Sequence, residues 1–313
     1  MKILFLTNMW PIKEHPYFGI HVKEQIEDLE KYSNVVPDIF FINGRKNILN
    51  YVLSIFIINY KLITKKYDLI HIHYGLSGLF LLVNPFIKIP KIITLHGGDI
   101  DIHNSTRLKV FLTKMITRKC DKIIILNDYM RSVLNKQKEK LIIIPCAVNT
   151  VLFNPHKVKR KGYSLVFPGN PERKVKNFAL FKRVVGLLKK TYPNIEIDII
   201  HNKSRQEVVD VLNKADCLIM TSISEGSPQI IKEAMACNTP VVSTTVGDVA
   251  FLLEGVENSY YVSSFDENEI STKVLRILSN RCRSNGREKI NTIGIDSAFV
   301  SKRIMNVYGS LLK

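Results

Sequence analysis

Short apolar runs alternate along this chain with longer amphipathic stretches. In the first half these runs predict six strands, over residues 3–7, 38–42, 69–73, 92–95, 122–126 and 141–145. The run at 122–126 lacks the apolar–polar alternation of a half-exposed strand, so we expect it to be buried on both faces of a parallel sheet. Between the first two strands, Val22, Ile26 and Leu29 fall on one face of an expected helix over 19–32.

A second series of strands is expected over residues 164–167, 196–200, 217–220, 240–243 and 260–262. The stretch 154–162 between the two series is polar and basic and contains proline and glycine, which favours a linker. Strands that alternate with helices indicate an α/β protein. We therefore predict two doubly wound, Rossmann-like domains, residues 1–157 and 158–297, that face a central cleft at the carboxyl ends of their sheets.

The composition is that of a globular protein, with 46% hydrophobic and 23% charged residues in a chain of 313, which is long enough for two cores. The cysteines are dispersed without a C-x-x-C pair, at Cys120, Cys146, Cys217, Cys237 and Cys282. This pattern favours reduced thiols in the cytosol over a disulfide or zinc framework. The first apolar run is too short for a signal peptide, and no stretch of about 18 residues is apolar throughout, so we expect no transmembrane helix.

The chain is strongly basic, with 45 Lys and Arg residues against 28 Asp and Glu residues and a net charge of +17. This excess favours an anionic partner, either a nucleic acid, a membrane surface or a phosphorylated substrate. Plain solubility is the alternative explanation. The sequence contains no aromatic-interleaved basic motif of the usual RNA-binding kinds, so charge alone supports a nucleic-acid-binding protein.

The segment 225–236, Glu-Gly-Ser-Pro-Gln-Ile-Ile-Lys-Glu-Ala-Met-Ala, carries two carboxylates at the start of an expected helix. Ser227 fits the N-cap and Pro228 the first helical position. The first turn offers unpaired N–H groups to an anion, and Glu233 lies roughly 7 Å beyond Pro228 along the axis. A ligand with a hydroxylated group at each end and phosphate between them, such as a nucleotide sugar, suits Glu225 and Glu233.

The alternative is that neither carboxylate binds a ligand. The apolar stripe of this helix is formed by Ile230, Ile231, Ala234 and Met235. Lys232 points away from the stripe, and Glu233 falls at its edge. The spacing alone leaves open whether Glu233 is a solvated helix residue and Glu225 a loop charge.

This segment resembles the E-x7-E signature of retaining GT-B glycosyltransferases, specifically glycosyltransferase family 4. Residues 214–222 before it and 237–244 after it resemble the same family's neighbouring strands. The resemblance implies a GT-B fold and a nucleotide diphosphate sugar as donor, with Glu225 holding sugar hydroxyls and Glu233 binding ribose hydroxyls. The helix start that it implies for donor binding consists of Gly226, Ser227, Pro228 and Gln229.

A basic loop opens the second domain, where residues 157–176 contain seven Lys or Arg residues and a single acid. Such a set suits a solvated loop as well as cations that neutralise a diphosphate leaving group without a metal. The family resemblance assigns the leaving group to Arg173 and Lys176, with Lys174 as the alternative second cation. We expect Gly169 on the donor side of the same loop.

The loop 96–99, His-Gly-Gly-Asp, follows a strand of the first domain. It is either a glycine turn with a hydrogen-bonded histidine or, by resemblance to the family's H-G motif, the loop whose His96 lines the cleft near the transferred sugar. Asp99 would orient the acceptor or close the loop. Gly19 resembles a family glycine that lets the backbone approach the donor phosphates or the acceptor. The loop before it does not have the pattern G-x-G-x-x-G, which weakens an interpretation of the chain as a dinucleotide-dependent dehydrogenase.

His71 and His73 alternate on one strand and point to the same face. Together with His96 they suggest a metal site as one alternative, but the spacing of a third ligand from this pair is not a recognisable one. Strand-end histidines packed near the cleft are the interpretation that we prefer. Because GT-B enzymes generally need no catalytic metal, the resemblance implies no metal and no cofactor besides the donor.

Residues 45–66 are basic at their ends and apolar within, and residues 85–88 add another apolar and basic surface. These are either buried helices of the first domain or a surface that meets anionic lipid and a lipid-linked acceptor. From the resemblance, we expect the amphipathic stretch 298–313 to pack back on the first domain. Residues 201–206 lead directly into a helix, whereas the family often has a glycine-rich turn and an additional strand at this place. The nucleobase contacts that the family usually makes there cannot be assigned to residues of this chain.

The combined expectation is a retaining hexosyl- or N-acetylhexosaminyltransferase that acts on the hydroxyl of a lipid-linked glycan or other sugar acceptor. Its pathway would be cell-surface polysaccharide synthesis, such as O-antigen, capsule or exopolysaccharide. We expect a cytoplasmic protein, peripheral at the inner face of an anionic cell membrane, that binds no nucleic acid. The alternatives are a basic nucleic-acid-binding protein, in which Glu225 and Glu233 would repel phosphates, and a non-catalytic nucleotide-sugar-binding subunit.

Overall fold

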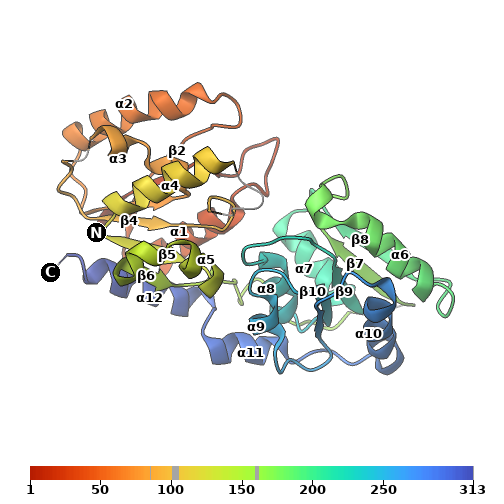
Figure 1. The fold of residues 1–313 in the computed structure, drawn as a ribbon. Helices are drawn as coiled ribbons and strands as arrows, with labels where there is room; N and C mark the ends of the chain where they lie inside the picture. Colours follow the sequence, from red (N-terminus) through yellow and green to blue (C-terminus); the bar gives the residue numbers. More distant parts are fainter. Residues whose placement is uncertain (85, 101–105, 159–161, 313) are drawn as a thin grey trace. The chain divides into compact units, whose positions relative to one another are not determined.

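A computed structural model describes residues 1–84, 86–100, 106–158 and 162–312 (Figure 1). They form two compact units, one of Met1–Ala147 with Ser297–Lys313 and the other of Val148–Asp296. Each unit is built around a parallel sheet of its own. Within the described ranges, every helix is too short or too polar to span a bilayer.

The described part of the first unit contains a six-stranded sheet in the order β2-β1-β3-β4-β5-β6. In that order the strands are Val36–Phe41, Lys2–Thr7, Leu69–His73, Lys91–Thr94, Lys122–Ile125 and Leu141–Ile143. Alternate residues of β1 supply two cores, with Leu4 and Leu6 in one and Ile3 and Phe5 in the other. All four side chains are fully buried, because helices cover both faces of this central strand.

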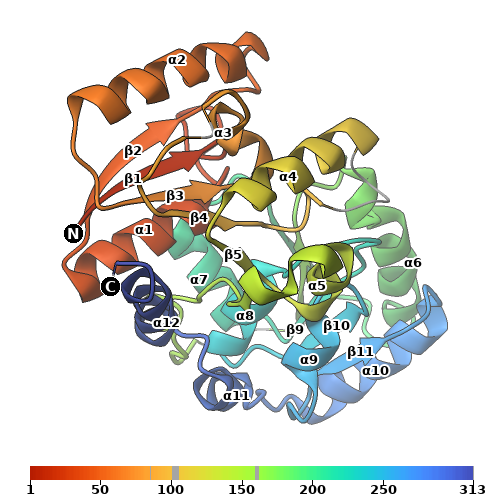
Figure 2. The ribbon, with the colours of Figure 1, turned by 60° about the vertical axis from the view of Figure 1, so that its left-hand side comes forward.

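Helices from both ends of the sequence cover this sheet (Figure 2). The core on one face is completed by α1 (Ile20–Ser33) and α12 (Ser297–Gly309), and the core on the other by α2 (Leu49–Thr64), α3 (Phe80–Val83) and α4 (Arg107–Lys119). Short elements complete the unit, namely η1 (Gly75–Gly78), α5 (Asp128–Val133) and η2 (Asn135–Lys140). The Arg303 guanidinium on α12 donates to the Ile143 carbonyl at 2.6 Å, which ties the end of the chain to the edge strand β6.

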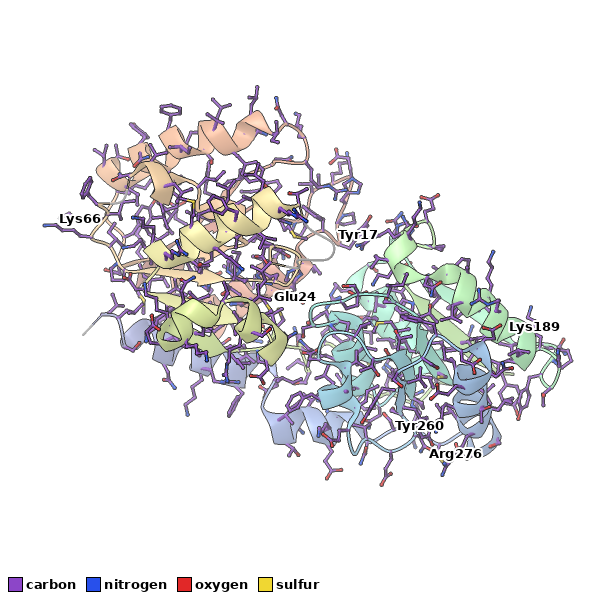
Figure 3. All side chains as sticks on the ribbon, in the orientation of Figure 1. Tyr17, Glu24, Lys66, Lys189, Tyr260 and Arg276 are labelled. Carbon is purple, nitrogen blue, oxygen red and sulfur yellow. The ribbon has the colours of Figure 1, made fainter. Side chains whose placement is uncertain are left out.

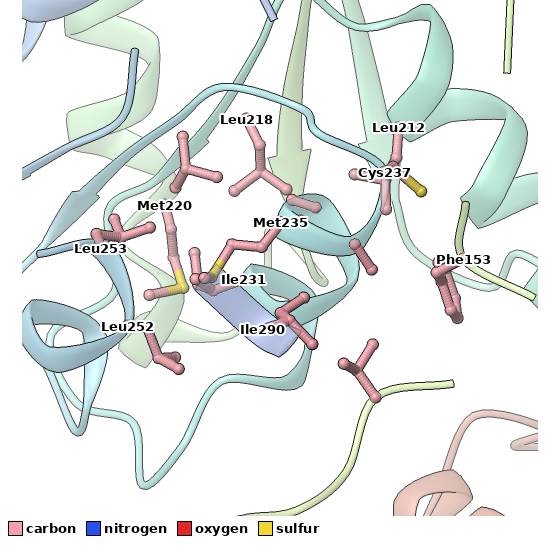
Figure 4. Packing of buried hydrophobic residues seen from close by; sticks show 14 of the residues in the cluster. Phe153, Leu212, Leu218, Met220, Ile231, Met235, Cys237, Leu252, Leu253 and Ile290 are labelled. Atoms are coloured by element: carbon pink, nitrogen blue, oxygen red, sulfur yellow. The ribbon is translucent and has the colours of Figure 1, made fainter. Parts of the chain in front are cut away.

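The second unit contains a five-stranded sheet, in the part described, in the order β11-β10-β9-β7-β8. In that order the strands are Tyr260–Val262, Val241–Thr244, Cys217–Met220, Ser164–Pro168 and Glu196–Ile200. One core contains residues of α6 (Phe178–Leu188) and α10 (Glu267–Asn280), and the other residues of α7 (Arg205–Lys214), α8 (Gln229–Ala236), α9 (Val249–Leu253) and α11 (Gly286–Ile293). Figure 4 shows the latter core, where Leu218 and Met220 of β9 pack with Ile231 and Met235 of α8.

The expected strands are all present, with ends shifted by at most two residues. The boundary between the units differs from the expected one, because the second unit begins at Val148 and not at 158. Val148 and Phe153 are fully buried in its core, and the His156 N–H donates to the Asn213 side chain at 2.9 Å. The polar stretch 154–158 is therefore a loop of the second unit, and residues 159–161 of the expected linker lie outside the described residues.

Candidate active site

Three loops of the second unit follow the neighbouring strands β7, β9 and β10. Because these strands are parallel and adjacent, their loops emerge at one edge of the sheet, where α/β folds usually bind ligands. The loops bring together the expected donor-site residues Gly169, Arg173, Lys176, Glu225, Gly226, Ser227 and Pro228. Gln229 is the first residue of α8, and Glu233 lies one turn further along this helix.

Lys176 and Glu225 form an ion pair across two of these loops. The Lys176 Nζ lies 2.6 Å from Glu225 Oε1, and the Ser222 hydroxyl donates to the same oxygen at 2.9 Å. The Lys176 backbone is fixed in turn, because the Thr221 hydroxyl donates to its carbonyl at 3.0 Å. Both charged side chains are largely buried, at 14% and 20% exposure, so the pair is a positioned part of the site and not a loose surface contact.

The neighbouring cations of this loop are less constrained. Arg173 and Lys174 are exposed at the start of the 3₁₀ turn η3 (Lys174–Lys176). Gly169 has a φ of +133°, and a Cβ there would lie 3.0 Å from Lys176 Cε. Gly169 therefore makes room for the Lys176 side chain, and among the three candidate cations it is Lys176 that meets Glu225.

The expected capping role of Ser227 is wrong. Helix α8 begins at Gln229, and Pro228 occupies the N-cap position with an extended backbone and no side-chain cap. The Ser227 hydroxyl donates instead to Asp248 Oδ2 at 2.6 Å. The Asp248 carboxylate that accepts this hydrogen bond is buried, and its pKa is raised by burial while nearby Lys232 opposes that rise.

A backbone contact fixes the same loop. Gly247 has a φ of +57°, and a Cβ at this position would lie 2.4 Å from the Gly226 carbonyl oxygen and 2.8 Å from that of Glu225. A side chain larger than hydrogen does not fit between these backbones. The loop after β10 therefore supports the Glu225–Gly226 segment directly.

Lys232, which the helical pattern places away from the apolar stripe, is nevertheless fully buried. Residues 231–236 of α8 are all buried, because α8 shares a core with α7, α9, α11 and the sheet. A helix covered on most sides has no solvated face, so its polar positions are interior positions.

Glu233 is also buried, at 3% exposure, which excludes a solvated helix residue. Arg205 Nη2 lies 2.9 Å from Glu233 Oε1, and the Arg205 guanidinium lies over the Phe153 ring at 4.6 Å from its centroid. Arg205 begins α7, whose N-terminus is secured by a capping box of Ser204 and Glu207. The carboxylate expected to bind ribose thus has a basic partner from a different helix.

In the first unit, Asp99 closes the loop that carries His96. Its side chain is fully buried and accepts hydrogen bonds from the His96 N–H and the Gly75 N–H, both at 3.2 Å. Burial raises the pKa of Asp99 to about 6, against the lowering effect of these backbone donors. The buried carboxylate is not presented to an acceptor, so of its two expected roles the structure supports loop closure.

The His96 ring lies within a stack of aromatic rings. Its centroid is 4.4 Å from that of Tyr74 and 5.4 Å from that of His73, and its Nε2 is 3.1 Å from His73 Nδ1. The Tyr74 hydroxyl is 2.9 Å from His21 Nε2. Tyr74 has a φ of +69°, which is strained for an aromatic residue, and such strain is often found at functional sites.

His71 and His73 share one face of β3, and their rings stack at 4.3 Å. Both ring nitrogens of His71 are engaged, with the Tyr308 hydroxyl at 2.6 Å and the Thr94 hydroxyl at 2.7 Å. Burial lowers the pKa of His71 to about 3 and that of His73 well below its usual value, so both are neutral at pH 7. The described residues contain no cluster of three His, Cys, Asp or Glu side chains that could hold a metal, so the structure favours packed histidines here.

Gly19 stands at the N-cap of α1 with a φ of +72°. A Cβ at Gly19 would lie 2.4 Å from the carbonyl carbon and oxygen of Met9 and 2.7 Å from the Trp10 nitrogen. The backbones of the first loop and of the start of α1 therefore approach each other closely at Gly19, where a side chain would not fit.

Two family models match the chain. The model described as Glycosyltransferase Family 4 matches residues 21–152, and the model described as Glycosyl transferases group 1 matches residues 157–280. The chain belongs to the group 1 glycosyltransferases. The expected glycosyltransferase family and the enzyme class, a glycosyltransferase, are thereby confirmed, whereas retention and the identity of the transferred sugar stay predictions.

Relatives of this glycosyltransferase include an uncharacterized glycosyltransferase of Methanocaldococcus jannaschii, which is 25% identical over 89% of this chain and 90% of its own. A putative teichuronic acid biosynthesis glycosyltransferase of Bacillus subtilis is 25% identical over 59% of this chain and 55% of its own. Among solved structures, sucrose-phosphate synthase of Thermosynechococcus elongatus has a TM-score of 0.78 at 16% identity, covering 99% of both chains. HepE of Anabaena in complex with UDP has a TM-score of 0.78 at 13% identity, covering 99% of this chain and all of the other. The expected fold class, GT-B with two Rossmann-like α/β domains, is confirmed.

In this glycosyltransferase, sequence reasoning missed Arg205 and Asp248. Arg205 follows the short connection after β8, where the family often adds a strand. The basic residue at that position was the available signal for a partner of Glu233. Asp248 follows Gly247 directly after β10, but no local pattern linked it to Ser227. Both pairings depend on helices or strands that meet only in the folded unit.

Proposed function

We propose that this glycosyltransferase moves a hexose or an N-acetylhexosamine from a nucleotide diphosphate sugar to an acceptor hydroxyl, with retention at the anomeric carbon and without a metal. The observation that carries the proposal is the Lys176–Glu225 ion pair at the carboxyl edge of the second sheet. This pair combines a cation for a diphosphate with a carboxylate for sugar hydroxyls. Both side chains follow strands that end beside each other.

Donor binding would exchange the partners of this ion pair. Diphosphate oxygens would accept from Lys176 Nζ, and a sugar hydroxyl would donate to the released Glu225 carboxylate. Arg173, exposed on the same loop, would add a second cation. The backbone N–H groups of Gly226, Ser227 and Gln229 would add positive potential at the start of α8. These groups replace the charge that a metal would supply, so we expect turnover in EDTA.

Glu233 would accept hydrogen bonds from the ribose hydroxyls, and Arg205 would compensate its negative charge. Since Glu233 is only 3% exposed, a ribose reaches it only when the Arg205 side chain, which is 26% exposed, shifts aside. The pair would therefore act as a cover over the ribose position in the unliganded protein.

In the proposed reaction, the bond from the anomeric carbon to the leaving phosphate oxygen breaks while the acceptor oxygen bonds to that carbon on the same face. The acceptor proton passes to the leaving diphosphate. By family resemblance, His96 would be a hydrogen-bond partner of the transferred sugar.

The relatives support this proposal. HepE of Anabaena has been solved with UDP and with UDP-glucose, and the Bacillus subtilis relative is named for teichuronic acid biosynthesis. We propose a lipid-carried cell-surface polysaccharide as the acceptor, at the cytoplasmic face of the membrane. The positive charge would then serve the phosphorylated donor and an anionic membrane, and not a nucleic acid.

An assay that needs no acceptor tests the reaction. The protein is incubated in EDTA with UDP- and GDP-sugars, and slow transfer to water is followed by proton NMR of the first-formed sugar anomer. We expect release of the same anomer as in the donor, and a loss of release in Glu225→Gln. Release of the opposite anomer would overturn retention, and release that requires added Mg²⁺ would overturn the metal-free site.

A further inference from the structure

Helix α2 is apolar on its outer face as well as its inner face. On the inner face, Ser54 and Ile58 are buried, and neighbouring side chains pack on the first core. The outer face consists of large side chains with exposures from 54% to 85%, namely Leu49, Val52, Leu53, Phe56, Tyr60 and Ile63. We call these six residues the α2 face. Surface helices normally turn polar residues outward, so an apolar stripe of about four turns indicates a binding surface.

The end of α3 and the residues after it extend this surface. Val83 is 67% exposed and Phe86 is 88% exposed, while Pro85 lies outside the described residues. The Asn84 amide donates to the Asn59 side chain at 2.6 Å, which ties this segment to α2. Both views show α2 at the margin of the first unit, with its outer side away from the sheet of that unit (Figures 1 and 2).

The stretch of sequence that contains the α2 face carries charges of one sign. Residues 39–67 contain five Lys or Arg residues and no Asp or Glu residue. Lys61 and Lys65 pair with Asp38, which lies just before this range. Lys46 and Lys66 are exposed, one before α2 and one after it, and Figure 3 shows Lys66 extending outward.

We infer that the α2 face docks on an anionic lipid bilayer. The apolar stripe would enter the boundary between headgroups and acyl chains, and Lys46 and Lys66 would contact anionic headgroups at its two ends. The α2 face would be the surface through which the protein contacts the proposed membrane. Only the purpose of docking, which is access to a lipid-linked acceptor, rests on the proposed function.

The charge pattern favours a bilayer over a second copy of the chain. In a two-fold dimer each surface meets itself, so attraction between charges requires both signs within the interface. The α2 face has cations before and after it and no carboxylate in the stretch, so two copies would place like charges near each other. A nucleic acid would need cations along the surface, where this stripe is apolar.

The test is co-sedimentation of the full chain with phosphatidylcholine vesicles, with and without phosphatidylglycerol. We expect binding to the anionic vesicles, weakened at least about tenfold in the double variant Phe56→Ser, Ile63→Ser because two exposed apolar side chains are lost. Phe265→Ser is the matched control, since Phe265 is an exposed phenylalanine, at 47%, in the second unit. Lys46→Glu with Lys66→Glu keeps the stripe and should reduce the preference for anionic vesicles at least about tenfold.

Thermal stabilisation by UDP or GDP, measured on each variant, separates this inference from the proposed function. A chain that binds a nucleotide but no vesicle overturns the docking surface alone. A chain that binds vesicles through the α2 face but no nucleotide supports the docking surface and counts against the donor site. Vesicle binding that survives Phe56→Ser, Ile63→Ser overturns the inference. The inference is also overturned if the wild type is a dimer in solution that does not bind vesicles and the double variant is a monomer.

Discussion

Arg205 of α7 and Glu233 of α8 form an ion pair at 2.9 Å in which the carboxylate side chain is only 4% exposed. The guanidinium also lies over the Phe153 ring, so this side chain links three segments of the second unit. The residue expected to hold ribose is thus neither solvated nor available without a change in its surroundings. If Glu233 binds ribose as proposed, the nucleotide affinity should include the free energy of moving Arg205.

The pair also contributes to stability. Arg205→Ala should lower the unfolding free energy of the second unit by about 2 kcal/mol, because it leaves the Glu233 carboxylate buried without this cation. The figure is smaller than for a fully buried pair, since Arg205 is 26% exposed. Urea unfolding followed by circular dichroism measures the change. Arg205→Lys keeps the positive charge and should lose less unfolding free energy than Arg205→Ala. Equal losses of unfolding free energy in the two variants would contradict the electrostatic explanation.

A pair of glycines tests the support of the Glu225 loop. Gly247 and Gly255 both have positive φ, at +57° and +74°, but only Gly247 has backbone atoms within reach of an added Cβ. Gly255→Ala should lose about 1 kcal/mol of stability from the backbone conformation, and Gly247→Ala should lose more because its Cβ also meets the Gly226 and Glu225 carbonyls. Only Gly247→Ala should also displace Gly226 and weaken nucleotide binding, measured by titration calorimetry. Similar nucleotide affinities in the two variants would show that this contact does not shape the site.

His71 gives the first unit a pH dependence of defined sign. Its folded pKa of about 3 lies below its ordinary value of 6.5, because the ring is buried. Between these values the unfolded chain takes up a proton that the native protein does not. The stabilising contribution is therefore complete above pH 6.5 and is lost as the pH falls towards 3, by a few kcal/mol in all.

The variant His71→Gln isolates this effect. The difference in unfolding free energy between wild type and variant should rise from acidic pH to about pH 6.5 and stay level above it. Circular dichroism of thermal unfolding at a series of pH values measures it. A difference that does not change with pH would mean that His71 titrates equally in both states.

The strands were predictable because their cores are made of continuous apolar runs. Strands β3, β8, β9 and β11 have the expected ends, and the pairing of β7 with both β8 and β9 follows from parallel α/β topology. Glu225 was singled out from the segment 225–236 itself, and the family resemblance added its role and the position of Lys176. Their mutual contact was not foreseen, because it joins residues from two separate loops.

The failures share one physical cause, which is tertiary competition for a local preference. Ser227 is a residue type that favours the N-cap, but α8 begins only at Gln229 and the Ser227 hydroxyl donates to the Asp248 carboxylate from a different loop. Lys232 occupies the polar side of a helical pattern, but other helices cover that side of α8. For α2 the inner and the outer face are both largely apolar, so periodicity could not decide which stripe is inside.

Nucleotide binding in EDTA tests the donor site most directly. Isothermal titration of UDP and GDP should show binding of one of them to the wild type. Lys176→Ala should weaken it at least about tenfold through loss of a charge-assisted hydrogen bond, and Glu233→Ala should weaken it as well. Lys174→Ala, at an exposed cation two residues away, should change it little. If neither nucleotide binds, or if Lys176→Ala binds as tightly as the wild type, the donor site proposed on the second unit is contradicted.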